Sequence, residues 1–333
     1  MLKQDNDNTS GKPEPAGHPL ITFALFAYKQ EQFIREAIKG AFSQTYEPLE
    51  IVLSDDCSPD NTFVIMQEMA AAYKGPHKII LNRNEKNLGL AEHINRVVEI
   101  SKGEWIVTAA GDDISLSNRV ADSCQVVEKY GEVGGVFGRF HSFRGEFCDN
   151  GQWGPSHAMD GLVVCGSNTA WIDRFERGES FGTPGCVAMW NRKLFDQFGP
   201  IPAGVIAEDV VLGNRAFFSG MGVGFTAAHM VLYRCHDANA CAGKNKSVFF
   251  RKALFSSAVS HQELVDFVRK HPDLYTEKDW NRIFTLFETS LFKTIVAARI
   301  NELGWFFSAL ILIVGVRHEK LKSKLRFIKA LLK

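Results

Sequence analysis

Glycine-rich phosphate loops are missing from this sequence of 333 residues. Neither G-x-G-x-x-G nor G-x-x-x-x-G-K-[ST] follows any of its apolar, strand-like runs. The loop after the first run, AYKQEQ at 27–32, contains no glycine at all. Dinucleotide-dependent dehydrogenases and P-loop NTPases are therefore disfavoured, as is a nucleotidyltransferase that cradles a triphosphate in its first loop.

The sequence also lacks paired cysteines, a net charge and a long apolar segment. Its 7 cysteines are scattered without a C-x-x-C pair, which favours reduced thiols in a cytoplasmic protein over a disulfide framework or a zinc site. Because 38 basic residues balance 38 acidic ones, we expect no nucleic-acid binding. The longest apolar run, 305–316, is shorter than the roughly 20 residues that span a bilayer.

Apolar runs alternate with amphipathic stretches between residues 20 and 113. The runs are continuous, as in strands covered on both faces, and the stretches between them carry apolar residues at helical spacing. This order predicts an α/β fold with a doubly wound, mostly parallel sheet flanked by helices. We expect strands at 20–28, 49–56, 77–84 and 104–113, and helices at 31–44, 58–75 and 88–103.

The pattern is less regular after residue 130. A Gly- and Trp-containing stretch there, to about residue 185, has no assigned role, and from residue 247 onward the chain is mainly helical in pattern. Between these parts the sequence predicts short elements. They are a strand at 133–140, helices at 191–199 and 207–220, and two short strands at 222–226 and 230–236.

Polar side chains stand at the ends of three predicted strands. The first strand ends at Tyr28, the second at Asp55 and Asp56, and the fourth at Asp112 and Asp113. Parallel strands end at one edge of a sheet, where open α/β sheets bind ligands, and carboxylates gathered there repel one another unless they share a cation. The pattern favours a hard divalent cation with a hydroxyl-rich ligand. The alternative is that each acidic pair only caps the following helix.

Four blocks of the sequence resemble the family 2 inverting glycosyltransferases, which have the GT-A fold. The resemblance implies an enzyme that moves a sugar from a nucleotide-sugar donor, expected to be UDP-linked, to a glycan or lipid-linked acceptor. The transfer would be a metal-assisted single displacement with inversion. The blocks follow the family's order. They are residues 21–62 with SDDCSPDNT, residues 87–120 with NLG, KGEWI and the acidic pair, AEDVVLGNRAFFSG at 207–220, and YRCHDAN at 233–239.

The resemblance implies roles for the residues at the strand ends. Tyr28 would face the base of the nucleotide, Asp55 would bind the base or the ribose, and Asp112 would bind the ribose. Asp113 would coordinate the cofactor, Mn²⁺ or Mg²⁺. Many family members carry Asp-x-Asp-Asp here, whereas Ala110 stands in place of the first acid, so Asp112 and Asp113 serve alone.

The two later blocks supply the remaining candidates. Asp209 matches the family's catalytic base, with Glu208 beside it, and a carboxylate is needed because a sugar hydroxyl is a poor nucleophile. The resemblance places His236 as a second metal ligand and Arg234 in support near the diphosphate. Other interpretations stay open: Glu208 and Asp209 as acids of a first helical turn, His236 as a structural histidine, and Arg234 as the partner of a carboxylate.

Two other functions remain alternatives. A sugar-phosphate nucleotidyltransferase would share the acidic metal site but should carry a glycine-rich basic first loop, which is missing. A catalytically inactive, sugar-binding relative would be expected to lose Asp113 or Asp209, and both are present.

The chain divides into a polar leader, a catalytic domain and a helical extension. The segment 316–333 carries 7 Lys or Arg and 1 Glu, with leucine and isoleucine along one helical face. Such a basic amphipathic helix favours an anionic membrane surface, which would make a cytoplasmic protein peripheral on the inner face of the membrane. Packing on the domain is the alternative. The parts are the leader 1–18, the GT-A domain 19–240 (nucleotide-sugar half 19–130, acceptor half 131–240) and the extension 241–333.

Overall fold

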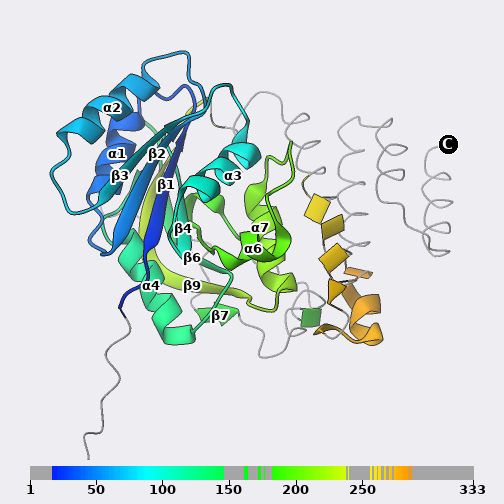
Figure 1. The fold of residues 1–333 in the computed structure, drawn as a ribbon. Coiled ribbons are helices and arrows are strands. Elements are labelled where there is room, and N and C mark those ends of the chain that lie inside the picture. Colours follow the sequence, from blue (N-terminus) through cyan, green and yellow to red (C-terminus); the bar gives the residue numbers. More distant parts are fainter. Residues whose placement is uncertain are drawn as a thin grey trace, which may run out of the picture.

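The computed structural model of the chain describes most of residues 17–237 and part of the segment 256–286. Among the described residues, nine strands form a single mixed sheet with helices on both faces (Figure 1). This confirms the predicted α/β fold class. The described residues are 17–145, 161–163, 172, 173, 176, 182–237, 239, 256, 259, 260, 262, 263, 266, 267, 270, 271, 274–283, 285 and 286.

The first half of the sheet is the predicted alternation of strands and helices. Its four strands are parallel, and each of the three helices connects one strand to the next in the chain. Three of the strands are buried almost throughout because helices cover both faces. The elements are β1 (Ile21–Ala27), α1 (Ile34–Phe42), β2 (Leu49–Asp55), α2 (Thr62–Ala72), β3 (Lys78–Arg83), α3 (Leu90–Ile100) and β4 (Trp105–Ala110).

The second half contains antiparallel pairs and shorter elements. They are β5 (Ile114–Ser115), α4 (Arg119–Tyr130), β6 (Gly135–Phe143), β7 (Gly161–Val163), the 3-10 turn η1 (Gly185–Val187), β8 (Met189–Asn191), α6 (Lys193–Phe198), α7 (Glu208–Phe218) and β9 (Val223–Arg234). Within the described part of the chain the strand order is β3-β2-β1-β4-β8-β6-β9-β5, with β7 paired to β9. β8 runs antiparallel between β4 and β6, so the sheet changes direction next to β4.

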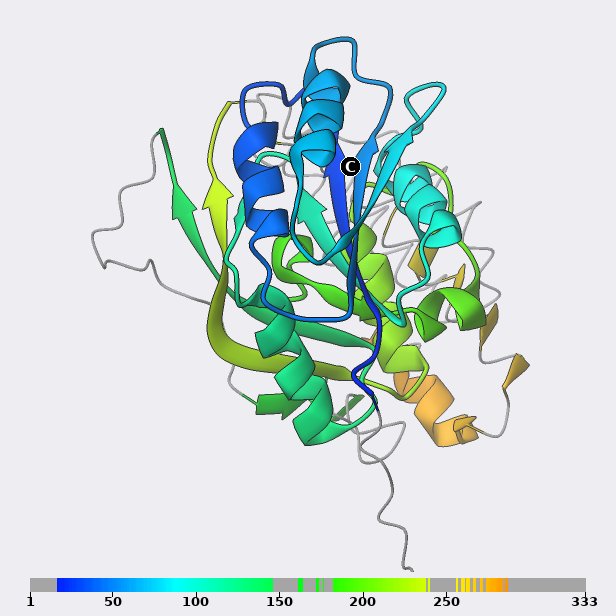
Figure 2. The same ribbon diagram turned by 60° about the vertical axis from the view of Figure 1, so that its left-hand side comes forward.

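Two apolar cores lie on opposite faces of the sheet. Side chains such as Phe23 and Leu25 of β1 pack against α1, α2 and α4, and these helices lie in front of the strands in Figure 2. The alternate side chains, Ala24 and Phe26, pack against α3, α6 and α7. Because strand side chains alternate between faces, one continuous apolar run serves both cores.

The structure corrects the prediction of two short strands at 222–226 and 230–236. They form one strand, β9, which pairs with β6 along most of its length. Thr226 to His229 interrupt the apolar pattern but not the strand, because shifts of register around Arg139 of β6 absorb the irregularity. The fourth strand also ends earlier than predicted, at Ala110, so that Asp112 and Asp113 lie in the following turn.

Helix α4 was not predicted, because its buried face is partly polar. Arg119 and Ser123 are both buried there, and they break the apolar spacing that marks an amphipathic helix. Arg119 donates to the hydroxyl of Ser115 (2.9 Å) and to the carbonyl oxygens of Thr108 (2.7 Å) and Ala188 (3.3 Å). A fully buried guanidinium therefore joins β4, β5 and the start of β8.

Several sequence-based predictions lie wholly or largely outside the described residues. These are the leader, of which only residues 17 and 18 are described, the apolar run 305–316 and the basic helix 316–333. Among the described residues, no helix is both long enough and apolar enough to cross a membrane. The division into a catalytic domain and an extension stays a prediction.

Candidate active site

The carboxyl ends of β1, β2 and β4 meet at one edge of the sheet. Ala27 is the register partner of Asp55, and Phe26 is the register partner of Ala110. The amide of Gly111 donates to the carbonyl oxygen of Phe26 (2.8 Å). These contacts bring the turn that carries the second acidic pair beside the end of β1.

Asp112 and His236 face each other across this edge. Nε2 of His236 lies 3.0 Å from Oδ2 of Asp112, and both side chains are largely buried. The imidazole also stacks on the ring of Phe33, with ring centroids 4.8 Å apart. The loop after β1, the turn after β4 and the segment after β9 thus converge on one point.

Asp113 lies deeper than Asp112 and is only 5% exposed. Its Oδ1 accepts a hydrogen bond from the backbone amide of Arg234 (2.9 Å). Burial, followed by the charge of Asp112, raises the pKa of Asp113 to about 7, although the nearby guanidinium groups oppose the shift. The turn therefore holds two adjacent carboxylates in a partly dehydrated place, which favours a bound cation.

Arg234 pairs with a carboxylate. This was the alternative to a supporting role near the diphosphate. Its guanidinium forms an ion pair with Glu36 of α1 and donates through Nε to the carbonyl oxygen of Asp112 (3.0 Å). The same group lies over the rings of Phe33 (4.9 Å) and Phe143 (4.6 Å). Arg234 thus fixes the turn that carries Asp112 and Asp113 (the acidic turn) against α1 and β6.

Asp55 and Asp56 are both buried and already hold backbone groups. Asp55 is 0% exposed; its Oδ2 accepts from the amide of Ser58 (2.9 Å) and lies 3.4 Å from Nε of Arg83, whereas its Oδ1 has no hydrogen-bond partner among the described residues. Asp56 accepts from the amides of Leu88 (2.8 Å) and Gly89 (2.9 Å). Both acids therefore shape the loops after β2 and β3.

Tyr28 has a different environment from the acids beside it. It follows β1 directly, and 41% of its surface is exposed. The ammonium group of Lys29 lies 5.1 Å from the centre of its ring. An exposed aromatic face at the carboxyl edge suits stacking against a planar base.

Asp209 lies in the first turn of α7, and Gly185 connects it to the edge of the sheet. The amide of Gly185 donates to Oδ2 of Asp209 (3.2 Å), and the carbonyl oxygen of Gly185 accepts from the hydroxyl of Thr108 in β4 (3.1 Å). A Cβ atom at Gly185 would lie 2.7 Å from Oε1 of Glu208. A side chain at residue 185 would therefore make the end of Glu208 move, and the backbone of Gly185 connects β4 to the first turn of α7.

Glu208 and Asp209 share a poorly hydrated environment. Burial, together with the charge of Asp209, raises the pKa of Glu208 to about 8. Burial also raises the pKa of Asp209, although hydrogen bonds from Gly185 and Val210 oppose that shift. Within this pair, Glu208 is the group that holds a proton near neutral pH, and the backbone donors favour the charged form of Asp209 against the effect of burial.

Replacing Glu208 tests this electrostatic arrangement. Because the folded protein holds the Glu208 proton more tightly than the unfolded chain does, wild-type stability falls as pH rises from about 4.5 to about 8. Glu208→Gln removes that loss. We expect the variant to gain about 1 kcal/mol in free energy of unfolding over wild type at pH 8, and little at pH 5. Urea unfolding at the two pH values measures the difference.

Glu92→Gln is the matched control, because Glu92 is an exposed acid in the first turn of α3. Its free energy of unfolding should differ from wild type by the same amount at both pH values. An equal effect of Glu208→Gln at pH 5 and pH 8 would contradict a raised pKa at Glu208.

The residues at the carboxyl edge fit a divalent cation. Mg²⁺ in nucleotide-using enzymes is commonly held by one or two carboxylates together with substrate phosphates. Asp112 and Asp113 supply that number, and the imidazole of His236 lies beside Asp112. Within the described part of the chain, no three His, Cys, Asp or Glu side chains are gathered as a ready-made metal site. The donor set therefore suits a cation that binds together with a diphosphate.

Several residues at this site were not expected from the sequence. Phe33 was interpreted as an apolar residue of the first helix, and Glu36 and Gly185 carry no local signal. Cys186 lies within electrostatic reach of both Asp113 and Asp209, and burial, followed by the charge of Asp113, raises the pKa of its thiol to about 12. Only spatial proximity of distant segments identifies these side chains.

Comparisons with known proteins agree with the fold and identify the family. The family model described as "Glycosyl transferase family 2" matches residues 22–199, more than half of the chain. Putative glycosyltransferase EpsE of Bacillus subtilis is 31% identical over 112 residues, which are 34% of this chain and 40% of EpsE. The Escherichia coli glucosyltransferase WfaP is 28% identical over 109 residues, 33% of this chain and 41% of WfaP. The chain thus matches less than half the length of either relative.

Solved structures share the fold at low sequence identity. S. aureus TarS 1–349 in complex with UDP-GlcNAc has a TM-score of 0.55 and 15% identity, covering 75% of this chain and 72% of TarS. The mannosyltransferase PcManGT of Pyrobaculum calidifontis, in complex with GDP-Man and Mn²⁺, has a TM-score of 0.53 and 15% identity, covering 89% and 90%. The fold is the GT-A fold of glycosyltransferases. The chain belongs to glycosyl transferase family 2.

Proposed function

We propose that the chain transfers a sugar from a UDP-linked donor to a glycan or lipid-linked acceptor, with inversion at the anomeric carbon. The observation that carries this proposal is the link through Gly185, which joins β4 and its acidic turn to Asp209 of α7. The turn at Asp112 and Asp113 is suited to the departing diphosphate, and Asp209 is suited to the attacking hydroxyl. A single displacement needs both, on opposite sides of the donor sugar.

Asp209 is the proposed general base. Its Oδ2 accepts from Gly185 and its Oδ1 accepts from Val210, so both oxygens have fixed directions. The acceptor hydroxyl would give its proton to this carboxylate as the new glycosidic bond forms, which is typically worth about 10²–10⁴ in rate. Glu208, which holds its own proton, would leave Asp209 as the ionised member of the pair.

The turn at Asp112 and Asp113 is the proposed grip on the nucleotide diphosphate. Asp113 would hold Mn²⁺ or Mg²⁺ with His236, while Asp112 and Tyr28 would bind the ribose and the base. A divalent cation bound there would neutralise charge that develops on the leaving diphosphate. Asp55, whose side chain is fully buried, would support the base site through the loop after β2 that it shapes. Arg234 holds the turn against Glu36.

The donor and acceptor classes rest on relatives. WfaP is a UDP-Glc:α-D-GlcNAc-diphosphoundecaprenol β-1,3-glucosyltransferase, and TarS forms a complex with UDP-GlcNAc. These activities support a UDP-sugar donor and a lipid-linked acceptor for this chain. A lipid-linked acceptor would sit at the cytoplasmic leaflet, and a peripheral location through the basic segment 316–333 is part of the same proposal.

A donor panel tests the proposal. The full-length protein is incubated with UDP-glucose, UDP-galactose, UDP-N-acetylglucosamine, GDP-mannose or a dTDP-sugar, with and without Mn²⁺. We expect slow release of UDP, and a higher melting temperature, with at least one UDP-sugar and only when Mn²⁺ is present. If no donor in the panel is hydrolysed or stabilises the fold, the chain is an inactive relative and the proposal is wrong.

A further inference from the structure

The helix that carries Asp209 begins without a cap of its own. Ala207 occupies the N-cap position of α7, and no side chain there accepts a hydrogen bond from the helix. Serine, threonine, aspartate or asparagine usually stands at such a position, because the first amides of a helix have no partner within it. Within α7, the carboxylate of Asp209 accepts from the amide of Val210, whereas the two residues before the helix are held by a group from elsewhere in the chain.

Ser256 supplies such a group. It belongs to the described part of residues 256–286, called the C-terminal segment below. Its hydroxyl oxygen accepts from the amides of Ile206 (3.2 Å) and Ala207 (3.3 Å), the two residues immediately before Glu208. Ser256 is 0% exposed, so its hydroxyl makes these contacts away from bulk water. The contact reaches across about 50 positions of the chain and acts two residues from Asp209.

The same segment holds the rest of α7. Arg215, which is fully buried, donates through Nε to Glu263 (3.0 Å) and pairs with both oxygens of that carboxylate. The hydroxyl of Tyr275 donates to the carbonyl oxygen of Phe218, the last residue of α7 (2.6 Å). The C-terminal segment therefore contacts the loop before α7, its body and its last carbonyl.

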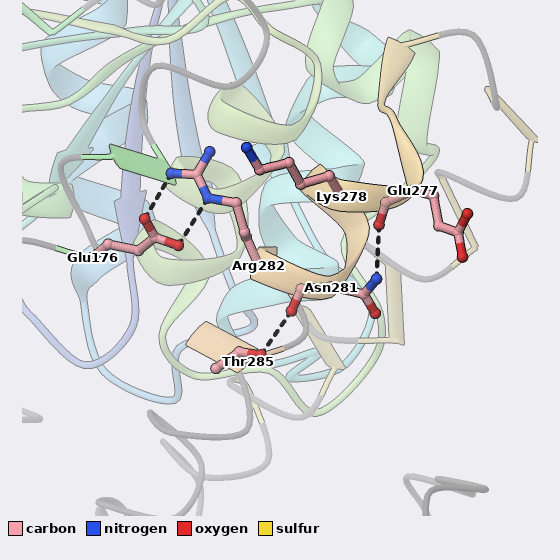
Figure 3. A pocket seen from close by; sticks show the side chains of 6 residues that line it. All are labelled: Glu176, Glu277, Lys278, Asn281, Arg282 and Thr285. Atoms are coloured by element: carbon pink, nitrogen blue, oxygen red, sulfur yellow. Dashed lines mark hydrogen bonds and ion pairs between the residues drawn. The ribbon is translucent and has the colours of Figure 1, made fainter.

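The segment is itself attached to the middle of the chain. The guanidinium of Arg282 pairs with Asp173 and with Glu176, and with Asp279 of its own helix. Figure 3 shows Arg282 directed at Glu176 beside an open groove of about 520 Å³, and the groove is lined by none of the proposed catalytic acids. The yellow and orange residues of the segment lie beside α6 and α7 in Figure 1.

We propose that the C-terminal segment sets the position of the catalytic base, and that Ser256 is a positioning residue for Asp209. The inference rests on the proposed function, because it assumes that Asp209 is the base. Ser256 touches neither donor nor acceptor. It fixes the two amides that precede Glu208, and a base displaced by about 1 Å loses up to about a hundredfold in rate.

The test compares Ser256→Ala with Ser260→Ala. Ser260 lies in the same segment and is also 0% exposed, but its hydroxyl has no hydrogen-bond partner among the described residues. With Mn²⁺ and the UDP-sugar that wild type hydrolyses fastest, we expect Ser256→Ala to lower kcat about tenfold or more while the KM for the donor stays within about twofold. Ser260→Ala should keep the wild-type kcat, and Ser256→Thr, which retains the hydroxyl, should restore most of it.

Each outcome decides a separate point. Equal kcat values for Ser256→Ala and Ser260→Ala would overturn the positioning role, as would a parallel loss of kcat and donor affinity. If Ser256→Ala does not fold, Ser256→Cys replaces it, because the thiol is a weaker acceptor of similar size, and the same outcomes apply. A wild-type protein that hydrolyses no donor would refute the proposed function itself, whereas an active wild type with unchanged variants would refute only this inference.

Discussion

Asp209→Asn is expected to lower the rate of sugar transfer by about 10²–10⁴ while donor binding stays largely intact. Asparagine keeps the shape of the side chain, but its single acceptor oxygen can keep the hydrogen bond from only one of the two amides that Asp209 accepts from, Gly185 and Val210. It cannot accept the proton of an attacking hydroxyl. Steady-state transfer, measured beside the Mn²⁺-dependent thermal shift with the donor, separates the loss of chemistry from a loss of binding.

Asp196→Asn is the control for this variant. Asp196 is also an acid in the first turn of a helix, α6, but it is exposed. Its replacement should leave the transfer rate near that of wild type. Full transfer by Asp209→Asn would show that the acids of α7 serve only the helix dipole, as the alternative interpretation of the sequence holds.

Asp113→Asn is expected to weaken Mn²⁺-dependent donor binding by about tenfold or more, equivalent to roughly 1.4 kcal/mol. The amide oxygen can still accept from the backbone of Arg234, so the turn should keep its conformation. What is lost is one of the two carboxylate charges available to the cation. Because Ala110 carries no acid, no further carboxylate from β4 is available to replace it. Titration of Mn²⁺ at a fixed donor concentration, followed by thermal shift, measures the change.

Asp122→Asn serves as the control for Asp113→Asn. Asp122 lies on α4, nearby in the chain, and its carboxylate accepts from the side chain of Asn118, away from the acidic turn. Donor binding in this variant should follow the same Mn²⁺ dependence as wild type. Unchanged Mn²⁺ affinity in Asp113→Asn would remove Asp113 from the proposed metal ligands.

The order of strands and helices and the identity of the strand-end acids could be read from local sequence. β1, β2 and β4 are continuous apolar runs because both of their faces are covered, and Tyr28, Asp55 and the pair after Ala110 follow directly where those runs end. α7 begins at Glu208, one residue inside the predicted helix. These features depend on neighbours within a few positions, which a periodic pattern records.

Elements without such a pattern were missed. α4 has buried Arg119 and Ser123 on its inner face, so its apolar spacing is weak. β9 was divided in two because residues 226–229 do not look like a strand, although pairing with β6 maintains it. In both cases, hydrogen bonds to distant segments replaced the local signal.

The sequence by itself determined the family resemblance, the α/β class and which acidic residues stand at the carboxyl edge. Only the tertiary structure decided what those residues face: His236 meets Asp112 across 124 positions, and Gly185 joins β4 to Asp209. It also decided that Ser256 of the C-terminal segment contacts the start of the catalytic helix. The physical reason is that a hydrogen bond between distant residues depends on how the sheet and helices pack. The spacing of apolar residues along the sequence does not record that packing.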